Sequence, residues 1–146
     1  MTTDTADRLL LACPHCLTAN RVPAARLGEN PGCGKCHAPL LEGKPVNLDD
    51  RSFDDFLART ELPVVVDFWA AWCGPCRMMA PAFERAAAEL KSEVRFAKVD
   101  TEAAQAIAAR YGIRSIPTMI LFKGGREANR ISGALDARSI LQWVRQ

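Results

Sequence analysis

The sequence predicts an α/β fold, in which helices flank a mixed central sheet and a small cysteine-rich segment precedes it. Beyond Pro45, helical and strand patterns alternate along the chain, which is typical of parallel strands joined by helices. Two late strand patterns are separated only by a turn, so we expect an antiparallel hairpin at one edge of the sheet. Up to Pro45, four cysteines and five of the nine prolines crowd a segment that has no period long enough to build a core.

The elements after Pro45 follow from the spacing of apolar residues. Positions three and four apart mark the helices, and continuous apolar runs such as Val64-Val65-Val66 mark buried strands. Asp136 is a suitable N-cap for the last helix. In chain order we expect a short strand at 46–48, a helix at 53–60, a strand at 64–69, a long helix at 75–90, a strand at 95–100, a helix at 104–111, strands at 118–122 and 127–132 around a turn, and a helix from 136.

Charge and hydropathy exclude some classes of partner. Nineteen Lys and Arg face seventeen Asp and Glu, and this near balance argues against a surface dedicated to nucleic acid. No apolar run approaches the roughly 18 residues that span a bilayer. The aliphatic run at 9–12 is too short for the core of an export signal. We therefore expect a cytoplasmic protein, monomeric, with no nucleic-acid or membrane partner.

All six cysteines fall into Cys-x-x-Cys pairs, and in a reducing compartment such pairs bind metal or do redox chemistry. The first two pairs are Cys13/Cys16 and Cys33/Cys36, sixteen residues apart. Two such pairs on tight turns can converge on one tetrahedral zinc ion, so we expect a single, non-catalytic Zn²⁺ site with four thiolate ligands.

Other interpretations of the N-terminal cysteines remain open. The four sulfurs could form two disulfides or stay free. Cys13-Pro14-His15-Cys16 also carries the dipeptide of strongly oxidising periplasmic disulfide catalysts, although the aromatic strand before it and the amphipathic helix after it are absent. With four cysteines in register, His15 and His37 are expected to lie outside the ligand set.

The third pair, Cys73 and Cys76, follows an apolar strand and opens a long helix. A cysteine at a helix N-terminus lies near unpaired amides and the positive end of the dipole, which lowers its pKa and favours the thiolate that attacks disulfides. Gly74 and Pro75 set a tight first turn that brings the second sulfur within reach. A third metal half-site would need a partner pair that the sequence lacks.

The chain from about Val46 onward resembles the thioredoxin family. The motifs that carry this resemblance are Trp72-Cys-Gly-Pro-Cys76, Val66-Asp-Phe-Trp69, the strand at 96–100, the run at 113–118, and Gly133-Ala134. The N-terminal segment, with Cys-Pro-His-Cys, the run at 19–23 and Cys-Gly-Lys-Cys, resembles the zinc-containing thioredoxin 2 subfamily. The resemblance implies a thioredoxin fold with a zinc-ribbon-like domain at 1–45 and a thioredoxin domain at 46–146, joined at 42–45 by a short linker rather than an integrated core.

The resemblance also implies roles for single residues. Cys73 matches the attacking cysteine and Cys76 the resolving one, while Asp67 matches a buried carboxylate that exchanges a proton with Cys76. Lys98 matches the lysine beside this carboxylate, and Pro117 matches a cis-proline next to the cysteines. From the residues alone, Asp67 could instead be an exposed strand-end aspartate and Lys98 a surface lysine.

A flat apolar surface for docking substrate follows from the same resemblance. It consists of Trp69, Trp72, Gly74, Pro75, Ile116 and Gly133. Trp69 could equally be core packing. The first strand of the thioredoxin part is short, so we expect it to rely on the zinc segment for cover.

The function implied is that of an enzyme, a thiol–disulfide oxidoreductase that reduces protein disulfides, transfers electrons in oxidative stress responses and is recycled by thioredoxin reductase. Two alternatives from other classes stay open: a zinc ribbon that recruits a partner with the redox part as scaffold, and a nucleic-acid-binding zinc ribbon. The near balance of charge in the first 45 residues argues against the nucleic-acid-binding zinc ribbon.

Overall fold

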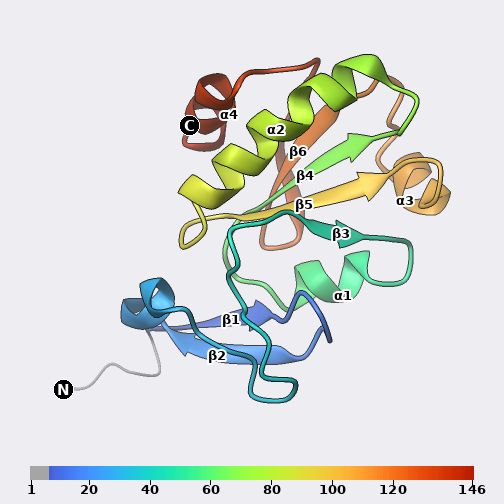
Figure 1. Ribbon diagram of the computed structural model, residues 1–146. Helices are drawn as coiled ribbons and strands as arrows, with labels where there is room; N and C mark the ends of the chain where they lie inside the picture. The colour runs from blue at the N-terminus through green and yellow to red at the C-terminus, as the bar shows by residue number, and fades with distance from the viewer. Residues whose placement is uncertain (1–6) are drawn as a thin grey trace.

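The computed structural model describes residues 7–146, in which a five-stranded mixed sheet lies beside a separate two-stranded sheet (Figure 1). The elements are β1 (Arg8–Ala12), β2 (Ala19–Pro23), a 3₁₀ helix (Ala24–Glu29), β3 (Val46–Leu48), α1 (Phe53–Ala58), β4 (Val64–Trp69), α2 (Gly74–Glu89), β5 (Arg95–Asp100), α3 (Gln105–Arg110), β6 (Thr118–Lys123), β7 (Arg126–Ser132) and α4 (Ala137–Val144). The predicted α/β fold is confirmed, and each element expected after Pro45 is present. None of the helices in residues 7–146 is both long and apolar enough to cross a bilayer.

β4 is the central strand of the larger sheet, whose order is β3-β5-β4-β6-β7. β3 and β4 run parallel to β5, whereas β6 and β7 are antiparallel additions at the other edge. The apolar run of β4 is buried because helices cover both faces of the sheet. α1 and α3 pack with Val64 and Val66, and α2 and α4 pack with Val65. Because side chains alternate along a strand, Asp67 lies on the face that α2 covers.

The N-terminal segment contains a hairpin that the sequence does not predict. β1 and β2 pair antiparallel, with Leu10 opposite Arg21. Leu40 and Leu41 share a small apolar core with this hairpin, and Leu62 joins it from beyond the linker. Each strand has only five residues, which is too short to give a clear period in the sequence.

The linker at 42–45 packs against the C-terminal part of the chain. Gly43 has a φ of +72°, and a Cβ at this position would lie 3.3 Å from the Cα of Ala88 on α2. Alongside β1, the backbone N–H of Glu61 donates to the Leu10 carbonyl at 2.7 Å, and the Leu10 N–H donates to the Glu61 carboxylate at 2.7 Å. The N-terminal segment and the chain after residue 45 therefore contact one another along both the linker and β1. These contacts go beyond the short linker that the sequence predicts.

Candidate active site and metal centre

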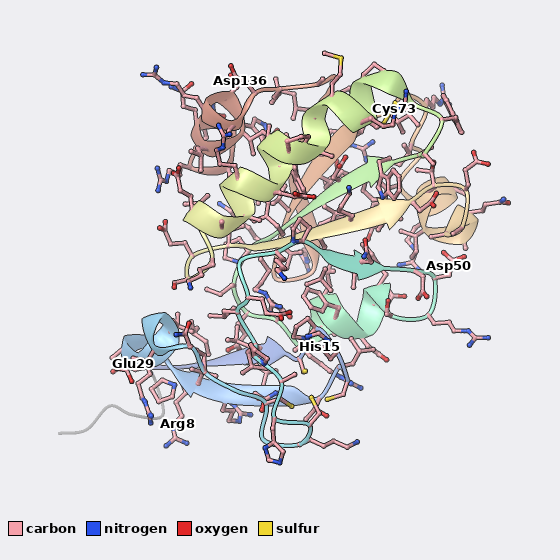
Figure 2. The ribbon with its side chains drawn as sticks, in the orientation of Figure 1. Arg8, His15, Glu29, Asp50, Cys73 and Asp136 are labelled. Carbon is pink, nitrogen blue, oxygen red and sulfur yellow. A yellow bond between two sulfur atoms is a disulfide. The ribbon has the colours of Figure 1, made fainter. Side chains whose placement is uncertain are left out.

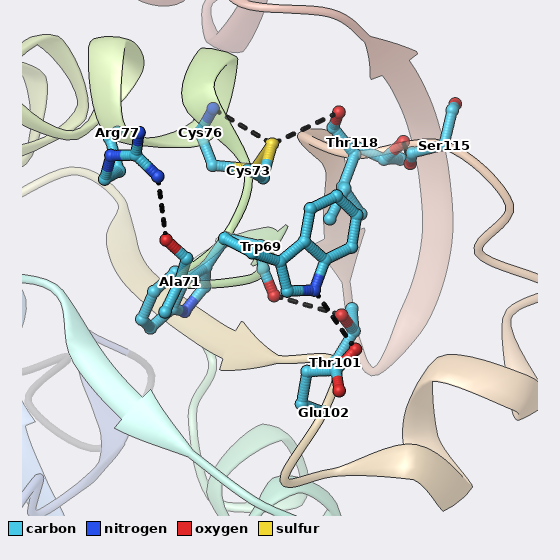
Figure 3. Close-up of a disulfide and its surroundings, with 11 residues drawn as sticks. Trp69, Ala71, Cys73, Cys76, Arg77, Thr101, Glu102, Ser115 and Thr118 are labelled. Atoms are coloured by element: carbon cyan, nitrogen blue, oxygen red, sulfur yellow. Dashed lines mark hydrogen bonds between the residues drawn. A yellow bond between two sulfur atoms is a disulfide. The ribbon is translucent and has the colours of Figure 1, made fainter.

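Cys73 and Cys76 lie where β4 leads into α2, and they form a disulfide (Figure 3). Their Cα atoms are 5.3 Å apart, and both residues are buried. Cys73 is the N-cap of α2, because its Sγ accepts the backbone N–H of Cys76 at 3.2 Å. Pro75 occupies the first turn, where no amide partner is needed. The helix thus begins at the cysteine pair itself.

This position favours a thiolate on Cys73 when the pair is reduced. The amide of Cys76 and the positive end of the α2 dipole both stabilise negative charge on the sulfur. The guanidinium of Arg77 donates to the Ala71 carbonyl at 2.9 Å and so holds the loop before Cys73 in place (Figure 3). The arrangement suits a reversible dithiol–disulfide couple.

Asp67 is a buried carboxyl group on the same face of the sheet as α2. It is 0% exposed, and within residues 7–146 neither of its carboxylate oxygens has a hydrogen-bond partner. Burial raises the pKa of Asp67 from an ordinary value near 3.8 to about 7, and the charge of Lys98 opposes part of that rise. The exposed strand-end alternative for Asp67 therefore does not hold, because the side chain is fully buried.

Lys98 is a neighbour of both Asp67 and an aromatic ring. It is the register partner of Asp67 on β5, and its Nζ is 4.6 Å from the ring centroid of Trp69. Trp69 also packs beside Cys73 and Cys76. Its indole N–H is buried without a hydrogen-bond partner in the described chain. The half-buried Trp69 ring therefore lies beside both Lys98 and the cysteine pair.

The loop before β6 also reaches the cysteine pair. The Ile116–Pro117 peptide bond is cis, as the resemblance implies. The Ile116 carbonyl oxygen lies 3.7 Å from the Sγ of Cys73. Gly133, whose φ is +101°, donates its N–H to the Pro117 carbonyl at 2.9 Å. The chain segments around Ile116 and Gly133 are therefore held together beside the disulfide.

The remaining residues of the expected docking surface are more exposed. Trp72 is 67% exposed, an unusual degree for a large aromatic side chain. Its indole N–H donates to the Glu102 carboxylate at 3.3 Å, which holds the ring beside the loop after β5. Gly74 is half-buried and Pro75 is exposed. These residues leave an apolar surface open next to the buried sulfurs.

The four N-terminal cysteines converge as their spacing predicts. The Sγ atoms of Cys13, Cys16, Cys33 and Cys36 all lie within 4.8 Å of one another. Cys13 Sγ is 3.6 Å from Cys36 Sγ, and Cys16 Sγ is 3.7 Å from Cys33 Sγ. Four sulfurs at about 2.3 Å from a tetrahedral Zn²⁺ would be about 3.8 Å apart, so the residues present fit this ion. None of these four cysteines forms a disulfide bond, so the two-disulfide alternative does not hold.

Each cysteine pair forms the same tight turn. Cys13 Sγ accepts the N–H groups of His15 and Cys16 at 3.4 and 3.5 Å. In the second turn, Cys33 Sγ accepts the corresponding N–H groups of residues 35 and 36 at 3.3 and 3.5 Å. Leu17 and residue 37 close the two turns with φ values of 64° and 67°. Amides that point at sulfur stabilise thiolates, which are the form that binds metal.

The electrostatics of the cluster match a site for a cation. The pKa of Cys33 is lowered to about 5, chiefly because the backbone amide of Cys36 donates to its sulfur. Burial opposes this effect, whereas the amide of Lys35 and the side chain of Asn20 add to it. The Ala38 amide lowers the pKa of Cys36, but burial and the neighbouring thiols outweigh it and raise that pKa to about 11. Four close thiols cannot all ionise unless a cation balances their charge.

Asn20 is a residue of this centre whose role the sequence does not reveal. Its amide N–H donates to Cys33 Sγ at 3.5 Å and to the Thr18 carbonyl at 3.0 Å, while its oxygen accepts the Gly34 N–H at 2.9 Å. Asn20 therefore connects the two turns. Its place four residues after Cys16, in the run at 19–23 that resembles the thioredoxin 2 subfamily, is the signal in the sequence. His15 lies outside the cluster, with Nε2 3.0 Å from the Glu42 carboxylate.

The two cysteine sites are well separated: in Figure 2 the labelled Cys73 lies near the top of the view, at the start of α2, whereas the labelled His15 lies much lower, near β1. The first is at the N-terminus of α2, and the second is in the turns after β1 and before residue 40. Electron transfer at one site therefore involves no direct contact with the sulfurs of the other. The structure brings together the residues of each site, and it keeps the two sites apart.

Comparison with known proteins accounts for both parts of the chain. The family model described as Thioredoxin matches residues 44–146, and the one described as Thioredoxin 2, N-terminal, matches residues 12–38. The chain is 44% identical over 138 residues to Thioredoxin C-3 of Corynebacterium nephridii, covering 94% of each protein. It is 36% identical to the M-type chloroplastic thioredoxin of Chlamydomonas reinhardtii, covering 84% of this chain and 90% of that protein.

A solved structure agrees with these matches. A mutant thioredoxin from Halobacterium salinarum NRC-1 superimposes with a TM-score of 0.64 at 31% identity, covering 70% of this chain and 89% of that one. The family model spans more than half of the chain and includes the cysteine pair at the start of α2. This chain therefore belongs to the thioredoxin family and is a thiol–disulfide oxidoreductase with an N-terminal zinc ribbon of the thioredoxin 2 type.

Proposed function

We propose that Cys73 is the attacking cysteine and Cys76 the resolving cysteine in the reduction of protein disulfides. The Cys73 thiolate attacks one sulfur of a substrate disulfide, forming a mixed disulfide and releasing the other substrate sulfur as a thiolate. The Cys76 thiolate then attacks Cys73 Sγ and releases the second substrate sulfur. The substrate gains two electrons, and the enzyme retains the Cys73–Cys76 disulfide. The amide-capped position of Cys73 at the N-terminus of α2 is the observation that carries this assignment.

Asp67 is the proton acceptor for Cys76 in this proposal. Resolution requires the thiolate of Cys76, so its proton must leave, directly or through water. A carboxyl group whose burial raises its pKa to about 7 can take up and lose that proton near neutral pH. Lys98 tunes Asp67 from the neighbouring strand.

The apolar surface around the disulfide is the docking site for the substrate chain. An extended substrate segment can lie on exposed Trp72 and Pro75 and half-buried Gly74, beside Ile116 and the cis-Pro117. Exposed aromatic surface next to buried sulfurs favours a protein over a small polar disulfide. Gly133 holds the adjacent loop, and Trp69 packs beside the cysteine pair.

The metal in the N-terminal centre is one Zn²⁺ per chain. Cys13, Cys16, Cys33 and Cys36 would hold it, and when bound it supplies a cross-link that a segment of this size needs for folding. The distance from the α2 cysteines argues for a non-catalytic role. We place the boundary of the two domains between residues 45 and 46, where β3 begins.

A thioredoxin reductase, the partner class of this family, reduces the Cys73–Cys76 disulfide again after each turnover. Four N-terminal cysteines that form no disulfide favour a reducing compartment, so we assign the protein to the cytoplasm. Disulfide reduction there suits a role in defence against oxidative stress. A monomer suffices, because both redox cysteines come from one chain.

Trapping of the mixed disulfide tests the assignment of the two cysteines. Cys76→Ser should accumulate a covalent adduct with insulin or another disulfide protein, visible by non-reducing electrophoresis and mass spectrometry. Cys73→Ser, as the matched control, should accumulate none. Adducts that form on Cys73→Ser through Cys76, and not on Cys76→Ser, would reverse the roles.

A further inference from the structure

One buried cation lies at the boundary of the two domains. Arg95, the first residue of β5, is only 5% exposed, on the face of the sheet that α1 covers. Its guanidinium lies over the Phe56 ring, 4.9 Å from the centroid, and donates to the Ala12 carbonyl at 3.2 Å. Ala12 is the last residue of β1 and precedes the metal ligand Cys13. Arg95 therefore belongs to the thioredoxin domain but contacts the backbone beside the metal centre.

The charge of Arg95 lacks a conventional partner. Within residues 7–146, no carboxylate forms an ion pair with it. A buried guanidinium is strongly destabilising unless anions or acceptors compensate for the lost water. Burial lowers the pKa of Arg95 to about 10, and the negative charges of Cys13 and Glu42 oppose this effect. Glu42 is solvent-exposed, whereas Cys13 is buried and directly follows Ala12, whose carbonyl accepts the hydrogen bond from Arg95.

We propose that Arg95 is the counter-cation of the zinc centre, supplied by the thioredoxin domain, so that metal retention and docking of the two domains stabilise each other. Four thiolates around one Zn²⁺ carry a net charge of minus two, and a buried cation beside them lowers the free energy of that anionic cluster. In return, the cluster compensates the burial of Arg95. This inference rests on the proposed zinc centre.

A neighbouring hydrogen bond to Ala12 makes it possible to distinguish the effect of the Arg95 charge from the effect of holding the backbone in place. The Thr60 hydroxyl accepts the Ala12 N–H at 3.3 Å, so Thr60 in the loop after α1 and Arg95 at the start of β5 both bind the backbone of Ala12. Thr60 carries no charge. A purely structural role for Arg95 would make the two residues equivalent for metal retention, whereas the counter-cation role makes Arg95 much the more important.

The test is the rate at which the full chain releases zinc to a chromogenic chelator, with Arg95→Met, Arg95→Gln, Arg95→Lys and Thr60→Val compared. Removing the charge in Arg95→Met or Arg95→Gln should speed release about tenfold or more. Arg95→Lys, which keeps the charge, and Thr60→Val should stay within about threefold of the wild type. Insulin reduction should change little in all four. If Arg95→Met fails to fold, the Gln and Lys variants decide the matter.

Two results would overturn the inference. Zinc release at the wild-type rate from Arg95→Gln, or equal acceleration in Arg95→Gln, Arg95→Lys and Thr60→Val, would show that the charge has no part in holding the metal. A wild-type chain that binds no zinc would remove the metal centre and this inference together, whereas bound zinc with no effect of Arg95 would remove this inference alone.

Discussion

Asp67 on β4 and Lys98 on β5 are register partners, and they lie on the face of the sheet that α2 covers. The carboxyl group is buried without a hydrogen bond in the described chain, and the lysine is held over the Trp69 ring, 4.6 Å from its centroid. A buried carboxylate is destabilising, so Asp67 keeps its proton to a higher pH than an exposed aspartate does and can exchange it near neutral pH.

Asp67→Asn should stabilise the protein above neutral pH. Because burial raises the pKa of Asp67 to about 7, the native chain binds a proton more tightly than the unfolded chain between about pH 4 and pH 7. Wild-type stability therefore falls as pH rises through this window. The variant has no proton to lose, so it should be more stable by about 2–4 kcal/mol at pH 8 and about equal at pH 4.

Urea unfolding of both oxidised proteins at the two pH values measures this difference. Effects of pH on the metal centre are common to wild type and variant and cancel in the comparison. A stability difference that does not change with pH would show that Asp67 is not the titrating group.

The same substitution should slow resolution more than attack. Without a carboxylate to accept the Cys76 proton, the second step should fall by about a hundredfold or more near pH 7, while formation of the mixed disulfide changes much less. Rapid-mixing kinetics that follow tryptophan fluorescence can separate the two steps. If both rates are unchanged at neutral pH, Asp67 has no part in proton transfer.

Lys98→Met should raise the pKa of Asp67 further. The positive charge of Lys98 opposes the effect of burial, so its removal shifts the titration of the carboxyl group to higher pH. NMR titration of the Asp67 carboxyl carbon reports this directly. Lys123→Met, an exposed lysine at the end of β6, is the matched control and should leave the titration in place. A titration that moves equally in both variants would mean that overall charge is responsible.

Asn20→Ala should weaken metal retention. The variant loses the N–H donor to Cys33 Sγ and the acceptor for the Gly34 N–H, so the two turns are no longer held in register. Zinc release to a chelator should accelerate by about 10- to 100-fold. Asn129→Ala on exposed β7 is the control. Release at the wild-type rate from Asn20→Ala would show that the turns are fixed by the metal alone.

A truncated chain that starts at Val46 should fold and still reduce insulin, but with lower stability. All the proposed redox residues lie beyond this point, whereas Ala12 packs into the same core as Phe56 and Val64. Loss of the apolar contacts made by the N-terminal segment should lower the free energy of unfolding by about 2–4 kcal/mol. The rate of insulin reduction should stay within about threefold of the full chain's rate. Circular dichroism and the insulin assay check both. A well-folded truncation without activity would show that the two domains act as one unit.

The sequence predicts most of the thioredoxin domain because its elements carry strong periods. The buried run at Val64 and the N-cap at Asp136 are local signals, and the structure has β4 and α4 at these places. The convergence of the four N-terminal cysteines also follows from spacing. The burial of Asp67 follows only from the resemblance to thioredoxins, because the residues alone also allow an exposed aspartate at the strand end.

What the sequence does not predict depends on partners distant along the chain. The β1–β2 hairpin is short and gains its stability from a core shared with Leu40 and Leu62. Arg95 reads as an ordinary charged residue at a strand start, and only the fold brings it to Ala12, more than eighty residues earlier. Asn20 likewise acquires its role when Gly34 lies beside it. Local patterns carry no information about such pairings.

Reduction of insulin disulfides by the full chain, with dithiothreitol as electron donor and zinc quantified in the same sample, tests the redox assignment most directly. The wild type should precipitate the insulin B chain well before the uncatalysed control, and Cys73→Ser should lose this acceleration while retaining about one zinc per chain. Catalysis that survives in Cys73→Ser, or its absence in a folded, zinc-loaded wild type, would contradict the assignment of Cys73 and Cys76 as the redox centre.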